Sequence, residues 1–171
     1  MTPRKTGNLD KVKKLTQEAT LSQKSRISGC REAEQGKHRR MARIAVATLG
    51  CKVNQCESAG IAEALTAQGM TVVPFEEEAD CYIVNTCTVT ERSDYQSRQL
   101  IRRAIRKNPE ASVLVTGCYA QRSPAEIARI PGVRLIAGNT EKEDILELIR
   151  QMARTQGQQC VVGDIRGEKG F

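Results

Sequence analysis

The feature that most constrains this fold is a regular alternation of short apolar runs with longer segments of helical periodicity. Five apolar runs, rich in Val, Ile and Ala, occupy residues 43–48, 71–73, 81–86, 112–116 and 133–136. Between them, apolar residues recur every three or four positions, which is the spacing of one face of an α-helix. This alternation predicts an α/β fold: a parallel sheet of four to five strands with helices on both faces, of the flavodoxin-like or Rossmann-like type.

Capping residues predict where the helices begin and end. A helix is expected to begin near Thr90, and side chains that accept hydrogen bonds from a first helical turn are expected at Asn54, Ser123 and Thr140. Glu57 and Glu143 lie three residues after the first and last of these, and they strengthen both N-caps. Gly69 and Pro109 are expected to close the first two helices.

The net positive charge is concentrated at the N-terminal end of the chain. The first 40 residues hold 11 Lys and Arg against 4 Asp and Glu, so they carry the whole net charge of +7. They contain few large aliphatic side chains, so residues 1–40 are expected to form a disordered basic extension. A nucleic-acid-binding arm, an organelle-targeting segment and a true start at Met41 instead of Met1 all remain open. The folded domain is expected at 41–154, with 155–171 as a tail or the start of a missing domain.

Composition excludes several classes of protein. No apolar run approaches the ~20 residues that cross a bilayer, so no membrane association is expected. No apolar segment follows the basic N-terminus, as a secretory signal would require, and the expected location is the cytoplasm. The 2 Phe, 3 Tyr and absence of Trp argue against a stacking platform for single-stranded nucleic acid.

Three of the seven cysteines share one position relative to the expected strands. Cys51 follows the first apolar run, Cys87 the third and Cys118 the fourth. If the strand order begins 2-1-3-4, these strands are neighbours about 4.8 Å apart, and the thiols would converge within about 10 Å at the carboxyl edge. Three thiolates there would suit an iron–sulfur cluster or zinc. Buried free thiols are the structural alternative.

The other cysteines and the single histidine are weaker candidates. Cys56 is expected to pack in the first turn of a helix, although it is close enough to Cys51 to be a spare ligand or a resolving thiol. Cys81 is expected in the core, and Cys30 and Cys160 in flexible segments. His38 lies in the basic extension, so the folded part lacks the usual general base. Seven cysteines without a secretion signal argue against a disulfide framework.

The motifs around the three cysteines resemble a known family. They read Leu-Gly-Cys-Lys-Val-Asn at Cys51, Asn-Thr-Cys-Thr at Cys87 and Thr-Gly-Cys-Tyr-Ala at Cys118. The residues of these motifs and their order along the chain resemble the N-terminal domain of the radical S-adenosylmethionine methylthiotransferases, over roughly residues 42–151. The first motif is most similar to the branch that acts on threonylcarbamoyladenosine in tRNA. Branches that modify isopentenyladenosine in tRNA or a ribosomal protein are the alternatives.

The resemblance implies that Cys51, Cys87 and Cys118 bind an auxiliary 4Fe–4S cluster. It implies methylthiolation of carbon 2 of the modified adenosine next to the anticodon, with tRNA as partner and S-adenosylmethionine as methyl donor and radical source. A second 4Fe–4S cluster belongs to the radical domain, whose Cys-x-x-x-Cys-x-x-Cys motif is missing from these 171 residues. The chain is therefore expected to be truncated and inactive alone, unless a separate chain supplies that domain. A zinc-binding or thiol redox module is the non-catalytic alternative.

Two further expectations concern side chains near these motifs. Cys56 stands where relatives commonly have an aromatic residue, and we expect it to be a harmless packing residue. The helix that begins near Thr90 has one basic face, formed by Arg92, Arg98, Arg102, Arg103, Arg106 and Lys107. A solvated face balanced by Glu91 and Asp94 is expected, with contact to tRNA phosphates as the alternative.

Overall fold

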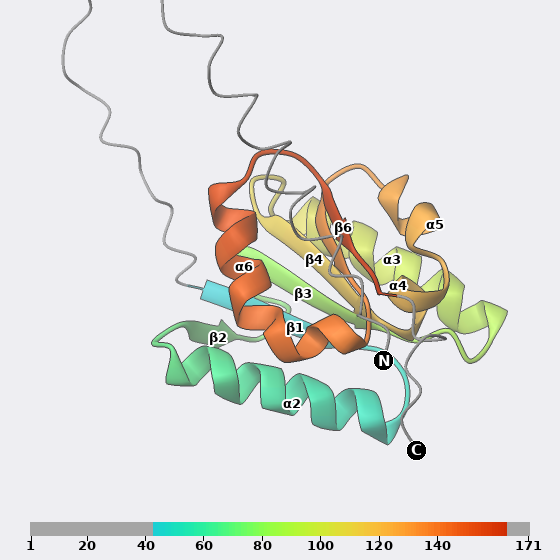
Figure 1. Ribbon diagram of the computed structural model, residues 1–171, viewed down its shortest axis with the longest axis horizontal. Helices are drawn as coiled ribbons and strands as arrows, with labels where there is room; N and C mark the ends of the chain where they lie inside the picture. Colours follow the sequence, from blue (N-terminus) through green and yellow to red (C-terminus); the bar gives the residue numbers. More distant parts are fainter. Residues whose placement is uncertain (1–42, 164–171) are drawn as a thin grey trace, which may run out of the picture. The chain divides into compact units, whose positions relative to one another are not determined.

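The computed structural model describes residues 43–163 (Figure 1). The basic extension expected at 1–40 lies outside the described residues, as do Met41, Cys30, His38 and the last eight residues of the segment 155–171. No helix of the described part is long and apolar enough to cross a membrane.

The described residues form one sheet in which every strand pairing is parallel. Its strand order is β2-β1-β3-β4-β5-β6. The strands are β1 (Arg43–Thr48), β2 (Thr71–Val73), β3 (Cys81–Thr86), β4 (Ser112–Gly117), β5 (Val133–Ala137) and β6 (Gln159–Val161). The first five follow the flavodoxin-like order 2-1-3-4-5, so the predicted fold class is confirmed.

The sheet has six strands where four to five were expected. The additional strand, β6, lies in the segment expected to be a tail, and it pairs with β5 from Leu135↔Gln159 to Ala137↔Val161. Cys160 and Val161 are exposed. A three-residue edge strand with exposed side chains has no buried face, so it lacks the apolar pattern by which strands are recognised in a sequence.

Helices cover both faces of the sheet (Figure 1). They are α2 (Lys52–Ala67), α3 (Glu91–Lys107), α4 (Cys118–Arg122), α5 (Pro124–Ala128), the 3₁₀-helix η2 (Thr140–Asp144) and α6 (Ile145–Arg154). Helices α3, α4 and α5 pack on one face through Ile101, Tyr119 and Ile127. Helices α2 and α6 pack on the other through residues that include Leu65 and Ile149.

The predicted helix ends are partly confirmed. Thr90 caps α3, since its hydroxyl accepts from the Ser93 N–H at 3.1 Å, and α3 ends at Lys107, before Pro109. Thr140 does not cap α6. It begins η2, and α6 starts only at Ile145. Within η2, the Glu141 carboxylate accepts a hydrogen bond from the Gly163 N–H, and the Lys142 ammonium group donates to the Glu57 carboxylate.

Candidate metal centre

The three motif cysteines lie at the carboxyl ends of three adjacent strands. Cys51 is the N-cap of α2 and follows β1, Cys87 follows β3 directly, and Cys118 is the first residue of α4 after β4. The register pairs Thr48 with Asn85 and Thr86 with Gly117, so these strand ends are level. The predicted neighbour order of the three strands is therefore confirmed.

Two glycines allow the loops at this edge to approach each other closely. Gly50 has φ 113°, and a Cβ placed on it would lie 2.7 Å from the Cβ of Cys87 and 2.9 Å from its Sγ. Gly117 has φ 99°, and a Cβ there would lie 2.3 Å from the carbonyl oxygen of Thr86. Both positions therefore require glycine. The residues next to them in the chain, Cys51 and Cys118, are brought to either side of Cys87.

The three thiols differ in exposure. Cys51 is exposed, Cys118 is half-buried and Cys87 is 4% exposed. The pKa of the Cys51 thiol is lowered, chiefly by the backbone N–H of Asn54 and also by that of Val53, which point at it from the first turn of α2. A thiol that ionises readily and faces solvent is suited to bind a soft metal.

The Asn54 side chain links the loop after β1 to the end of β3 through hydrogen bonds. It is 2% exposed, and its Nδ2 donates to the carbonyl of Leu49 at 2.8 Å and to that of Thr86 at 3.1 Å. Its Oδ1 lies 3.9 Å from the Sγ of Cys51. The prediction that Asn54 caps α2 was wrong, because Cys51 takes the N-cap position and Asn54 turns its amide inward.

A second buried amide supports the first. The Asn85 Nδ2 donates to the Asn54 carbonyl at 3.0 Å and to the Ser58 Oγ at 3.1 Å, and it lies 3.4 Å from a carboxylate oxygen of Glu57. Its Oδ1 has no hydrogen-bond partner within residues 43–163 and faces Gly117, where a Cβ would lie 2.6 Å away. The Leu49 N–H donates to the Asn85 carbonyl at 2.9 Å, and the Thr86 hydroxyl donates to the Thr116 carbonyl, so the strand end before Cys87 is joined to both neighbouring strand ends.

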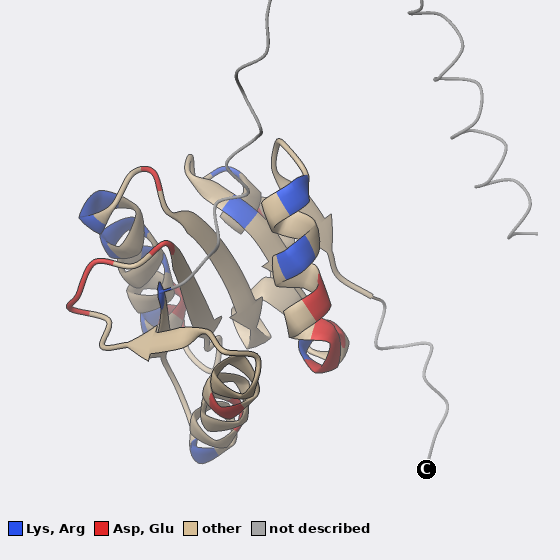
Figure 2. Ribbon diagram, turned by 90° about the vertical axis from the view of Figure 1, so that its left-hand side faces the viewer, with Lys and Arg blue, Asp and Glu red and all other residues tan. Residues whose placement is uncertain are grey.

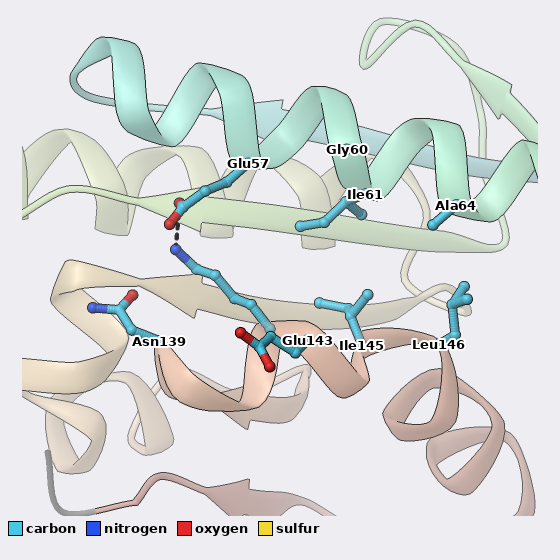
Figure 3. A pocket seen from close by; sticks show the side chains of 9 residues that line it. Glu57, Gly60, Ile61, Ala64, Asn139, Glu143, Ile145 and Leu146 are labelled. Carbon is cyan, nitrogen blue, oxygen red and sulfur yellow. Dashed lines mark hydrogen bonds and ion pairs between the residues drawn. The ribbon is translucent and has the colours of Figure 1, made fainter. Parts of the chain in front are cut away.

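A charged pair extends the network to the C-terminal half of the domain. The Lys142 Nζ lies 2.5 Å from the Glu57 carboxylate, and the Lys142 side chain is only 8% exposed. The pair closes one end of a cavity of about 380 Å³ between α2 and the η2–α6 segment (Figure 3). Gly60, Ile61 and Leu146 line the remainder. The Glu57 carboxylate therefore links Lys142 to the Asn85 amide and, through Asn85, to the backbone of Asn54.

Hydrogen bonds from α3 stabilise the cysteine edge on the face of the sheet opposite α2. Ser97 donates from its hydroxyl to the carbonyl of Cys87 at 3.1 Å. The Tyr119 hydroxyl, next to Cys118 in the chain, accepts from Arg98 at 2.9 Å and donates to Glu126 at 2.7 Å. Burial raises the pKa of Tyr119, so the hydroxyl stays protonated and remains a donor. These bonds fix the backbone on either side of Cys87 and Cys118.

A single metal ion and an iron–sulfur cluster place different demands on the spacing of the three thiols. No three Cys, His, Asp or Glu side chains in the described part lie close enough together to hold one metal ion. A tetrahedral zinc ion with bonds of about 2.3 Å would draw its sulfur ligands to about 4 Å from one another. A four-iron cluster accepts each thiolate on a different iron and therefore tolerates wider spacing. Three thiols around a glycine-lined edge are compatible with such a cluster.

The remaining cysteines are dispersed. Cys56 is exposed on α2, so its expected role as a packing residue is wrong. Cys81 is fully buried as predicted, and burial raises its pKa to about 12, so it stays a neutral thiol. Cys160 is exposed in β6, which is an ordered strand and not the expected flexible segment.

Sequence reasoning missed several members of this network. Asn85 was part of a recognised motif but had no assigned role, and Ser97, Glu57 and Lys142 were not linked to the cysteines. Asn85 did carry a signal, since a polar amide at the end of an apolar run requires a partner when buried. Lys142 carried none, because its contact with Glu57 spans 85 positions of the chain.

Comparison with known proteins gives one family and a consistent set of relatives. Residues 43–138 match the family described as uncharacterized protein family UPF0004. A threonylcarbamoyladenosine tRNA methylthiotransferase MtaB of Bacillus subtilis is 51% identical over 111 residues, 65% of this chain and 25% of the relative. The MtaB of Aquifex aeolicus is 42% identical over 127 residues, 74% of this chain and 31% of the relative. A ribosomal protein uS12 methylthiotransferase RimO of Roseiflexus castenholzii is 34% identical over 110 residues, 64% of this chain and 24% of the relative.

Proposed function

The chain belongs to uncharacterized protein family UPF0004, and from its similarity to tRNA methylthiotransferases we propose that it is the cluster-binding part of such an enzyme. Cys51, Cys87 and Cys118 are the proposed ligands of an auxiliary 4Fe–4S cluster. The supporting observation is their position at the ends of three adjacent parallel strands, where Gly50 and Gly117 let the flanking loops close on Cys87.

The proposed substrate follows from the relatives. The two MtaB proteins, at 51% and 42% identity, are more similar to this chain than the ribosomal protein methylthiotransferase at 34%. We therefore favour threonylcarbamoyladenosine next to the anticodon of tRNA, which would be methylthiolated at carbon 2. A tRNA substrate would place this activity in the cytoplasm.

The complete reaction needs more than this chain. The chain spans about a quarter of the length of these relatives. A radical domain with a second 4Fe–4S cluster and S-adenosylmethionine would have to come from a longer protein or from a separate chain. The proposed part played by residues 43–163 is to hold the auxiliary cluster.

The residues of this chain would position and tune that cluster. With three protein thiolates, the cluster would supply one iron open to a sulfur ligand from outside the chain. The backbone N–H groups at the start of α2 favour the thiolate form of Cys51. Asn54 fixes the loops before Cys51 and Cys87. Lys142 neutralises the Glu57 carboxylate, which would otherwise add a negative charge beside the thiolates.

Anaerobic reconstitution with iron and sulfide tests the ligand set. We expect about four iron and four sulfide per chain in the wild type, and loss of both in Cys51→Ala, Cys87→Ala and Cys118→Ala. Cys160→Ala and Cys56→Ala are the matched controls and should retain wild-type iron. A cluster that survives in any of the first three variants would refute the assignment, and stoichiometric zinc without sulfide would favour a structural metal site instead.

A further inference from the structure

One face of helix α3 carries a stripe of side chains suited to bind nucleic acid. Arg92, Tyr95, Gln99, Arg102 and Arg106 are spaced by three or four residues, so they lie along one side of the helix. The buried side of α3 is formed by other residues, Ser97, Ile101 and Ala104. We call the first five residues the α3 stripe. In Figure 2, α3 is the helix at the left, and several of its residues are Lys or Arg, drawn in blue.

The arginines of the α3 stripe are not neutralised by the described protein. Arg103 and Lys107, beside the stripe, pair with Glu76, and Arg98 pairs with Glu126. Within residues 43–163, Arg92, Arg102 and Arg106 form no ion pair. All three are exposed.

The acids that were expected to balance this face do not reach the stripe. Asp94 is turned toward Arg122, whose Nη1 lies 3.9 Å from its carboxylate. Glu91 is the first residue of α3, where it complements the helix dipole. Three positive charges therefore remain available over a length of about 20 Å, since α3 rises 1.5 Å per residue.

An aromatic ring and a groove accompany these charges. Tyr95 is 57% exposed, so much of this aromatic side chain is accessible to a ligand. A groove of about 330 Å³ runs beside the stripe. Its lining residues are Leu49, Gln96, Gln99, Leu100, Arg103 and Arg106. Leu49 lies two residues before Cys51, so the groove begins at the cysteine edge.

We propose that the α3 stripe binds RNA, with the arginines on phosphates and Tyr95 stacked on an unpaired base. This rests on the proposed function, because it assigns the RNA substrate to a surface beside the cluster ligands. An acidic protein would also complement the arginines, and Tyr and Arg are common at protein–protein interfaces. RNA is favoured because the proposed substrate of the site beside the stripe is a tRNA. Arginine with an accessible aromatic residue is the combination that holds single-stranded nucleotides.

Fluorescence anisotropy with a labelled RNA hairpin that has a single-stranded loop tests this proposal on the full chain. The stripe variant carries Arg92→Gln, Arg102→Gln and Arg106→Gln. The control carries Arg129→Gln, Arg150→Gln and Arg154→Gln, which are exposed arginines outside α3. Both variants lose the same charge and keep the basic residues 1–40. In the stripe variant, the slope of log affinity against log salt should fall in magnitude by about 2 to 3. The control slope should change much less.

Tyr95 provides the second, charge-independent test. Tyr95→Ala should weaken hairpin binding by about tenfold, whereas Tyr95→Phe, which keeps the ring, should bind like the wild type. Equal weakening by the two arginine triples, or no effect of Tyr95→Ala, would overturn the proposal and leave a protein partner as the better explanation. Iron and sulfide counted on the same samples keep this separate from the proposed function. Normal cluster content without selective RNA binding would refute only the RNA-binding role of the α3 stripe and would leave the proposed cluster site unaffected.

Discussion

At the residue scale, one buried amide determines the geometry of the cysteine edge. Asn54→Ala removes two hydrogen bonds to carbonyls at the ends of β1 and β3. We expect it to lower the free energy of unfolding by about 2 kcal/mol and to reduce iron content after reconstitution. Urea denaturation and iron analysis measure both effects. Asn108→Ala is the matched control, because Asn108 donates to the Ala79 carbonyl outside the cysteine edge. Equal iron loss in both variants would contradict this role of Asn54.

A glycine substitution tests the close approach of the loops. Gly117→Ala would place a methyl group against the carbonyl oxygen of Thr86, at a positive φ that side chains rarely adopt. A loss of about 3 kcal/mol in unfolding free energy is expected. In contrast, Gly60→Ala lies within α2 with nothing within 4 Å of the added carbon, and it should stabilise the domain by up to about 1 kcal/mol. Thermal unfolding of the two variants distinguishes a required glycine from an incidental one.

Thiol ionisation gives a pH-dependent prediction for the metal-free protein. The pKa of Cys51 is lowered by backbone N–H groups, whereas burial raises that of Cys160. Because the thiolate is the nucleophile, alkylation of Cys51 by iodoacetamide should increase at a lower pH than that of Cys160. Mass spectrometry of the alkylated peptides across neutral and mildly alkaline pH measures both. If Cys160 reacts at the lower pH, the helix start does not activate Cys51.

The sequence predicted which cysteines share the edge but not what holds them there. Strand-end position is a local property, so it can be read from the apolar runs and the residues after them. The orientation of Asn54 is not local, since its donors point at a carbonyl 32 positions away. A side chain of that type at the start of a helix is normally a cap, and the cap was the reasonable prediction.

At the element scale, an ion pair joins α2 to η2. Lys142→Met leaves the Glu57 carboxylate half-buried beside Asn85 without its counter-charge. We expect a loss of about 2 kcal/mol in unfolding free energy, most of it recovered when Glu57→Gln is added. The exposed pair Arg150–Glu147 is the control, and Arg150→Met should cost less than about 0.5 kcal/mol. A double-mutant cycle by chemical denaturation measures the coupling, and additive effects of Glu57→Gln and Lys142→Met would argue against it.

The elements themselves were predictable to the extent that they bury an apolar face. The strands β1 to β5 and the helices α2, α3, α5 and α6 bury apolar side chains, and their patterns predict them, although α6 starts at Ile145 and not at Thr140. Elements that depend on long-range bonds did not follow from the sequence. The 3₁₀ turn η2 is held by Glu57 from α2, and β6 exists only through its pairing with β5.

At the scale of the whole molecule, the core does not depend on the cysteine edge. The two apolar clusters, one on each face of the sheet, include none of Cys51, Cys87 and Cys118, although Cys87 itself is buried. We therefore expect the triple variant Cys51→Ala, Cys87→Ala, Cys118→Ala to fold with wild-type far-ultraviolet circular dichroism. Cluster loading should raise the melting temperature of the wild type alone, because a ligand that binds only the native state stabilises it. Loss of structure in the triple variant would show that the thiols are core residues and not ligands.

The wide separation of the cysteines along the chain has a consequence for biogenesis. A compact cysteine motif can be metallated while its polypeptide is still emerging from the ribosome. Here Cys51, Cys87 and Cys118 come together only after β1, β3 and β4 have paired, which requires two complete crossovers. Any iron–sulfur donor would then meet an acceptor whose sheet is already built. Misfolded chains, in which the three cysteines are apart, would therefore not receive a cluster.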